Sequence, residues 1–261
     1  MDLIIFGGQS NMQGQTDTLS EERVVERALE YKYLTDELVP LKNPTGEDIR
    51  CDGTAGYAFL HDSDPAEWLK LHVTGSACYG YTNLVPAFCR AYVRSTGRSV
   101  VAAHIAKGST MVADWLPGTP GYEALVKKGS AAKEKAGADR VFFVWLQGES
   151  DAIFRTSKED YKSSLTALCE GMKRDLSLER FGVIRVGRFT LDERDIVILD
   201  AQDEICCENK DFLMLTELAT ALNERPDCMN PYCGGHFSAL GLELLGEAAG
   251  NALGAYVKQA R

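Results

Sequence analysis

The sequence predicts an α/β fold in which a parallel sheet is covered by helices on both faces. Apolar runs of strand length alternate along the chain with segments of helical periodicity. Three of the runs, residues 2–6, 99–106 and 141–146, lead directly into polar turns that contain glycine. Parallel strands joined by right-handed crossovers end at one edge of a sheet, and ligands bind at that edge. We therefore expect the three turns to lie together.

The first strand, residues 2–6, is followed by the turn GGQSNMQG at residues 7–14. Ser10 then lies just past the carboxyl end of a buried strand, at the rim where α/β sheets bind ligands. The glycines leave room for backbone N–H groups to approach whatever the serine attacks. We interpret Ser10 as a nucleophile; the alternative is that it caps a short helix beginning near Asn11.

The remaining elements are expected in order from their periodicity and their turn residues. Residues 42–76 are irregular, and a loop of that length in a compact domain is usually functional or disordered. We expect it to set specificity, although its aromatic residues, with His61 and His72, could equally pack the loop onto the body. The other elements are short strands at 30–34 and 37–41, a helix from residue 84 that ends at Gly97, the strand 99–106, a helix at 122–136, the strand 141–146, a helix at 158–175, a strand at 181–187, helices at 195–208 and 213–223, and a final helix at 238–258.

Composition limits the classes of function. The chain has 261 residues, 45% of them hydrophobic, which suits one large domain, 1–261, with no repeat or linker. Its net charge of -10 argues against a nucleic-acid or anionic-membrane partner. The 8 cysteines include no CxxC pair, so we expect no structural zinc, no disulfides and mostly buried, reduced thiols. Without a leader-like or membrane-spanning segment, the expected location is cytoplasmic.

A serine nucleophile needs a base, and imidazole is the usual one because its pKa lies near 7. Of the 4 histidines, His104 lies inside an apolar strand and reads as a core residue. His236 lies in the glycine-rich segment CGGHFSALG (residues 233–241), just before the last helix, where glycines allow the ring to face a cleft. His236 is the predicted base; the alternative is an ordinary histidine near a helix cap.

Acyl transfer also requires donors placed to receive an oxyanion. The side-chain amide of Gln147, at the end of the strand 141–146, and the backbone N–H of Gly80 could each supply one. The alternatives are a hydrogen bond from Gln147 that only fixes its loop, and a simple turn at Gly80 before a helix.

Taken together, GQSNM (8–12), AKGST (106–110) with Trp115 downstream, WLQGESD (145–151) and HFSALG (236–241) resemble one family. The chain resembles the sialate O-acetylesterase-like and acetylxylan esterase branch of the SGNH hydrolase superfamily over about residues 2 to 255. The resemblance implies a three-layer, flavodoxin-like fold with a central parallel sheet of about five strands. It also implies hydrolysis of O-acetyl esters on carbohydrates, with no metal or other cofactor.

The resemblance assigns roles to individual residues. It makes Ser10 the nucleophile, His236 the base, and Gln147 the occupant of a position where many members have an oxyanion asparagine. The glycine donor maps to Gly80, with Gly75 as a competitor, and the Ser10 N–H is a further donor. The expected substrate contacts are Gln9, Asn11, Lys107 and Trp115.

One position departs from the family pattern. Much of the superfamily has an acid three residues before the histidine, where this chain has Cys233. A thiol cannot hold imidazolium as a carboxylate does. Either the site is a Ser–His dyad steered by a backbone carbonyl, or another acid assists. The candidate acids, in order, are Glu149, Asp151 and Asp227.

Three alternatives remain open from the sequence. An acetylxylan esterase would use the same residues as a sialate esterase. Cys233 leaves room for a carbohydrate-binding relative without activity, although the retained Ser10, Gln147 and His236 argue against it. A nucleotide-binding protein is disfavoured because neither P-loop nor GxGxxG spacing is present.

Overall fold

The computed structural model describes residues 1–16, 23–33, 35–43, 45–46 and 82–259. In these residues a seven-stranded sheet has the order β3-β2-β4-β1-β5-β6-β7. Only β3 runs antiparallel to its neighbour, and the remaining pairs are parallel. The strands are β1 Asp2–Gly8, β2 Ala28–Lys32, β3 Glu37–Pro40, β4 Val100–Ala106, β5 Arg140–Leu146, β6 Leu178–Ile184 and β7 Phe212–Thr216.

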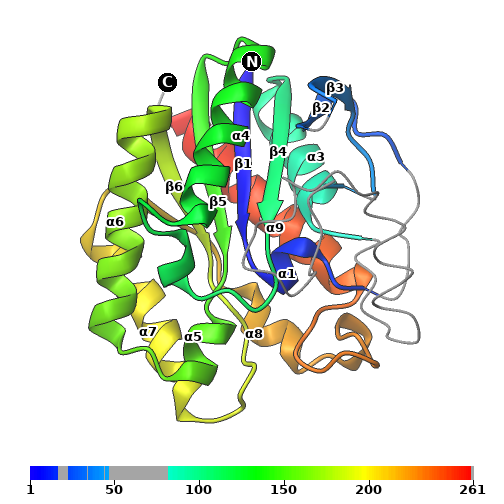
Figure 1. Ribbon diagram of the computed structural model, residues 1–261. Helices are drawn as coiled ribbons and strands as arrows, with labels where there is room; N and C mark the ends of the chain where they lie inside the picture. Colours follow the sequence, from blue (N-terminus) through cyan, green and yellow to red (C-terminus); the bar gives the residue numbers. More distant parts are fainter. Residues whose placement is uncertain (17–22, 34, 44, 47–81, 260–261) are drawn as a thin grey trace.

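Helices cover both faces of the sheet, which confirms the predicted three layers (Figure 1). Helices α4 and α6 lie in front of the sheet in that view, and α3 and α9 lie behind it. The central strands β1, β4 and β5 are buried almost throughout because both of their faces are covered, and this explains their unbroken apolar sequence. The helices are α1 Ser10–Gln13, α3 Val85–Thr96, α4 Pro120–Ala136, α5 Glu149–Phe154, α6 Lys158–Leu176, α7 Glu193–Glu208, α8 Leu218–Asn223 and α9 Ala239–Gln259, with 3-10 turns η2 Val112–Trp115 and η3 Pro226–Cys228.

The last helix packs closely on α3 through a stripe of small residues. A Cβ atom at Gly246 would lie 2.4 Å from the Leu84 carbonyl oxygen, and one at Gly250 would lie 2.2 Å from that of Phe88. These glycines therefore let the two helix backbones approach each other. The packing fixes α9, whose first residue follows His236 by three positions.

The structure corrects two expectations about the sheet. It has seven strands rather than about five, and residues 213–223, predicted as one helix, form β7 followed by the short helix α8. Leu and Met in Phe212–Thr216 favour helices in isolation, but pairing with β6 and packing against α9 override that propensity. No described helix has the length and apolar character needed to cross a bilayer.

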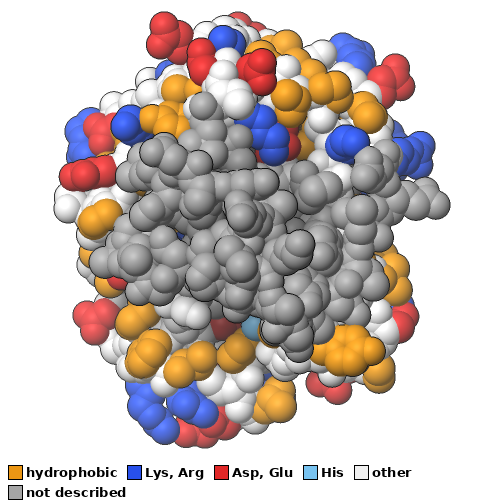
Figure 2. Space-filling view, turned by 45° about the vertical axis from the view of Figure 1, so that its right-hand side comes forward, with side chains coloured by type: hydrophobic (Ala, Val, Ile, Leu, Met, Phe, Trp, Pro, Cys, Tyr) orange, Lys and Arg blue, Asp and Glu red, His pale blue; other side chains and the backbone are white. Residues whose placement is uncertain are grey.

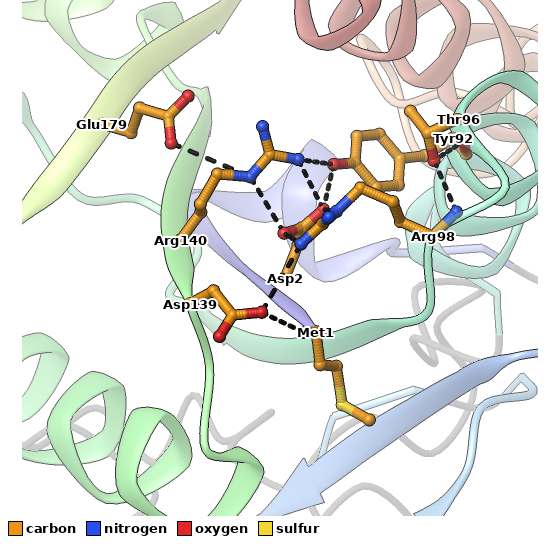
Figure 3. A network of polar contacts seen from close by, with 8 residues as sticks. All are labelled: Met1, Asp2, Tyr92, Thr96, Arg98, Asp139, Arg140 and Glu179. Atoms are coloured by element: carbon orange, nitrogen blue, oxygen red, sulfur yellow. Dashed lines mark hydrogen bonds and ion pairs between the residues drawn. The ribbon is translucent and has the colours of Figure 1, made fainter. Parts of the chain in front are cut away.

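A buried carboxylate closes the opposite edge of the sheet, where β1 begins (Figure 3). The two oxygens of Asp2 accept hydrogen bonds from the guanidinium groups of Arg98 and Arg140 at 2.7–3.1 Å, and Tyr92 donates at 2.5 Å. Burial by itself would raise the pKa of Asp2. The hydrogen bonds from Arg98, Arg140 and Tyr92 outweigh burial and lower the pKa from 3.8 to about 2.

We expect Asp2→Asn to destabilise the fold by about 3 kcal/mol near neutral pH, because it leaves two arginines without their buried counter-charge. A carboxylate with a lowered folded-state pKa stabilises the protein above its unfolded-state pKa, near 3.8, and that stabilisation is lost as the pH falls towards about 2. The difference in unfolding free energy between wild type and variant should therefore shrink below pH 3.8. Urea unfolding at several pH values measures it, and an unchanged difference at low pH would contradict the assignment.

Candidate active site

The three polar turns predicted to meet do lie at one edge of the sheet. Gly8, the last residue of β1, pairs with Ala106 at the end of β4 and with Leu146 at the end of β5. The turns that follow, at residues 9–14, 107–110 and 147–151, therefore start side by side. Direct hydrogen bonds join them: Gln13 Oε1 accepts from Gly108 N at 2.7 Å, and Gln9 Oε1 accepts from Ser150 N at 3.2 Å.

Ser10 is presented by a turn that only glycine permits. Gly8 has φ +147, and a Cβ atom there would lie 2.0 Å from the Leu146 carbonyl oxygen. Ser10 opens the four-residue helix α1, so its backbone N–H has no partner within the helix. Within the described residues, neither this N–H nor Ser10 Oγ forms a hydrogen bond. The serine thus has both a free hydroxyl and a free donor beside it.

His236 is held through one ring nitrogen and leaves the other without a partner. Its Nδ1 lies 3.0 Å from the Gly234 carbonyl oxygen, and its Nε2 is buried with no hydrogen-bond partner. Because a carbonyl oxygen can only accept, Nδ1 carries the proton and Nε2 presents a lone pair. Burial lowers the pKa of His236, which favours the neutral ring that a base requires. Of the described histidines, His236 is 8% exposed and His104 1%. Figure 2 shows a small pale blue area of histidine surface next to hydrophobic side chains.

The nucleophile turn and the histidine segment are tied together by asparagines. Asn11 Nδ2 donates to the Gly235 carbonyl at 3.2 Å, and Asn11 Oδ1 accepts from Phe237 N at 3.1 Å. Asn230 Nδ2 donates to the Gln15 carbonyl at 3.0 Å. Residues from the two ends of the chain therefore meet at the site, as the Ser10–His236 assignment requires.

None of the three candidate acids is hydrogen-bonded to His236 within the described residues. Glu149 accepts from Asn11 at 2.8 Å, and burial raises its pKa. Asp151 accepts from Gln147, Val112 N and Thr156, and Asp227 pairs with Arg225 on the surface. The Gly234 carbonyl makes the contact with His236 Nδ1 that a helper carboxylate would make. Of the two alternatives left open by the sequence, the geometry favours the dyad steered by a backbone carbonyl.

Gln147 connects the turns. Its Nε2 lies 2.9 Å from the Thr110 carbonyl, 2.5 Å from Asp151 Oδ2 and 3.3 Å from Gln9 Oε1, while Tyr161 donates to its Oε1 at 3.3 Å. The side chain is fully buried. An amide group has two protons, and both face acceptors here. An oxyanion role for Gln147 stays a prediction. It requires one of the two amide protons to leave its present acceptor and turn towards the substrate oxygen.

The four expected substrate contacts differ in burial and in their hydrogen bonds. Gln9 and Asn11 are buried and hydrogen-bonded within the protein, and Trp115 is fully buried, donates to Thr110 Oγ1 at 3.0 Å and packs edge-on against Trp145. Lys107 is partly exposed. It lies beside the site, because its backbone N–H donates to the Gly8 carbonyl. Gly80, its competitor Gly75, His61, His72 and most of the 42–76 loop lie outside the described residues.

The expectation of reduced thiols is wrong at one position. Cys233 is disulfide-bonded, whereas Cys89, Cys169, Cys206, Cys207 and Cys228 are free. The sequence contained no local pair that could have revealed this bond. Cys233 Sγ lies 3.1 Å from His236 Nδ1. A disulfide sulfur has no proton to donate, so the proton on Nδ1 belongs to the imidazole ring and points to acceptors of the protein.

Sequence reasoning missed the residue that packs against the base. The ring of Phe189 meets that of His236 edge-on, with centroids 5.8 Å apart. A Cβ atom at Gly235, which has φ +75, would lie 2.2 Å from the same phenylalanine ring. No local signal marks this contact, because it depends on the loop after β6. In the described part of the chain, no group of His, Cys, Asp and Glu side chains could hold a metal ion.

Comparisons with known proteins identify the family of this chain. A family model described as carbohydrate esterase, sialic acid-specific acetylesterase, matches residues 1–247. The chain belongs to this family. The resemblance to the sialate O-acetylesterase family is thereby confirmed, and the chain is a hydrolase of the class that acts on carbohydrate acetyl esters.

Individual relatives are distant. A probable carbohydrate esterase of Arabidopsis thaliana is 24% identical over 189 residues, which cover 70% of this chain and 67% of the relative. The X-ray structure of an Arabidopsis thaliana protein superposes with a TM-score of 0.70 at 18% identity, covering 98% of each chain. The crystal structure of NanS gives 0.69 at 14% identity, covering 100% of this chain and 98% of that one. At these identities the structural similarities show the fold alone.

Proposed function

We propose that this chain is a serine esterase that removes O-acetyl groups from sialic acids through a Ser10–His236 dyad. The observation that carries the proposal is the state of His236, whose Nδ1 is fixed by Gly234 while its buried Nε2 has no partner. The family match over residues 1–247 supports the substrate class. An unpaired buried nitrogen is costly, and its segment is joined by Asn11 to the turn that carries the free serine hydroxyl, which is the arrangement that a site for proton transfer needs.

The mechanism follows from these positions. Ser10 Oγ attacks the acetyl carbonyl carbon while His236 Nε2 takes the hydroxyl proton. The oxyanion is received by the Ser10 N–H, with the Gly80 N–H as the proposed second donor. His236 then gives its proton to the sugar oxygen as the acetyl C–O bond breaks. Water, deprotonated by His236, attacks the acetyl-serine, and acetate leaves as the serine regains its proton.

Acetate release from two acetylated carbohydrates tests the substrate class. With equal acetyl concentrations of O-acetylated sialic acid and acetylated xylooligosaccharide, we expect kcat/KM to be at least about 10-fold higher for the sialic acid. Ser10→Ala provides the blank for spontaneous hydrolysis. The opposite preference would identify an acetylxylan esterase, and no acetate from either sugar would refute the esterase.

The rate should rise with pH through a midpoint below the ordinary histidine value of 6.5, because burial lowers the pKa of His236. The base accepts a proton only when its ring is neutral, so activity is lost as the pH falls through that pKa. The profile of kcat/KM against pH between 4 and 8 measures this midpoint in the free enzyme. A midpoint above 6.5 would contradict a base whose charged form is disfavoured by burial.

A further inference from the structure

The side chain of Asn11 is almost saturated with hydrogen bonds. Its Nδ2 donates to Glu149 Oε1 at 2.8 Å and to the Gly235 carbonyl at 3.2 Å, and its Oδ1 accepts from Phe237 N at 3.1 Å. Both amide protons are therefore used, and the side chain is 2% exposed. This leaves no donor for a substrate, although the sequence had suggested a substrate contact.

The partners of Asn11 lie on both sides of the base. Gly235 and Phe237 are the two neighbours of His236 in the chain, so the amide holds the backbone on either side of the imidazole. Asn11 also follows Ser10 directly in the short helix α1. Two hydrogen bonds from one planar group fix both the distance and the rotation of the histidine segment relative to the nucleophile turn.

Glu149 accepts the second proton of the Asn11 amide. The Gly235 carbonyl can only accept and the Phe237 N–H can only donate, so all three contacts favour one orientation of the amide, and Glu149 strengthens it through Oε1. Glu149 is itself buried, with Oε2 lacking a hydrogen-bond partner, and it forms no ion pair with a described residue. A buried carboxyl without a counter-charge is expensive, which argues for a role beyond stability.

We propose that Asn11 is the positioning residue that sets the approach of His236 to Ser10, and that Glu149 acts on the reaction only by orienting the Asn11 amide. This inference rests on the proposed function of the dyad. This role of Glu149 differs from that of a helper acid, which would have to contact His236 itself.

Removing the amide should affect turnover more than substrate binding. We expect Asn11→Ala to lower kcat by roughly 100-fold with KM changed less than about threefold, because a small displacement of the base misaligns the proton transfer. Tyr92→Phe is the control, since it removes a buried hydrogen bond at the opposite edge of the sheet and should leave kcat unchanged. A raised KM with unchanged kcat would make Asn11 a substrate contact and overturn the proposal.

Variants of nearly equal shape test the partnership with Glu149 even if Asn11→Ala folds poorly. Asn11→Asp keeps the acceptor for Phe237 N but sets two carboxyls against each other. Such a pair retains one proton only at lower pH, so above the pH at which His236 is neutral the activity of this variant should fall as the pH rises, whereas that of wild type should stay level. Glu149→Gln can still accept from Asn11 and should lose less than about 10-fold in kcat.

The double variant Asn11→Asp with Glu149→Gln reverses the direction of the hydrogen bond, since an amide now donates to a carboxylate. We expect its kcat at pH 8 to exceed that of Asn11→Asp by at least about 10-fold. Multiplicative losses without rescue would overturn the role of Glu149. Wild type and Ser10→Ala are assayed in parallel: full activity in Ser10→Ala refutes the dyad, whereas an inactive Ser10→Ala with an unaffected Asn11→Ala refutes only the positioning role.

Discussion

Ser10→Ala is expected to lower kcat for acetyl ester hydrolysis by roughly 10⁴-fold or more, because the proposed acetyl intermediate forms on its hydroxyl. The fold should be unaffected, since Ser10 Oγ makes no hydrogen bond within the described residues and its removal breaks none. Initial rates of acetate release with wild type and variant at equal concentration measure the effect.

A serine remote from the site provides the matched control. Ser157 accepts from Asp160 N at the start of α6, and Ser157→Ala should cost about 1 kcal/mol of stability while kcat is unchanged. If Ser10→Ala kept more than about a tenth of wild-type kcat, the nucleophile would have to be another residue.

His236→Ala should cause a loss of similar size, roughly 10⁴-fold in kcat, because the hydroxyl of Ser10 would lose the group that takes its proton. Residues that act as a unit are not additive, so Ser10→Ala combined with His236→Ala should be little worse than either alone. Steady-state rates of the three variants measured together give this comparison.

Added imidazole separates loss of the base from general damage to the site. The truncated side chain leaves the space that the His236 ring occupied, so free imidazole should raise the rate of His236→Ala and have no effect on Ser10→Ala. Equal stimulation of both variants, or a double variant whose losses multiply, would mean that the two residues do not act on one proton.

The elements that could be predicted from sequence are those fixed by local pattern and full burial. The strands β1, β4 and β5 are apolar throughout because helices cover both of their faces, and the turns after them are polar because they lie at the open edge. The strand β7 was missed because it is half-buried and rich in Leu and Met, so its pairing with β6 decided its structure.

The site was predictable only as far as residue type and topology determine it. The nearness of Ser10 to the His236 segment was expected from the family pattern and from the need of a serine nucleophile for a base. A steering backbone carbonyl and a loop-fixing bond of Gln147 were alternatives from the sequence, but which groups form them could not be predicted, because that depends on side-chain geometry. The bonds of Asn11 to residues 224 and 226 positions away could not be predicted because they join distant segments. The disulfide of Cys233 could not be predicted from the sequence either.

The central claim is that one hydroxyl and one imidazole form a covalent intermediate at this edge of the sheet. Labelling with an active-site phosphonate ester, followed by peptide mass spectrometry, tests it most directly, because the adduct marks the atom that attacks. We expect a single adduct on the peptide that carries Ser10 in wild type and none in His236→Ala. An adduct on another residue, or hydrolysis that continues at full rate without one, would contradict the account.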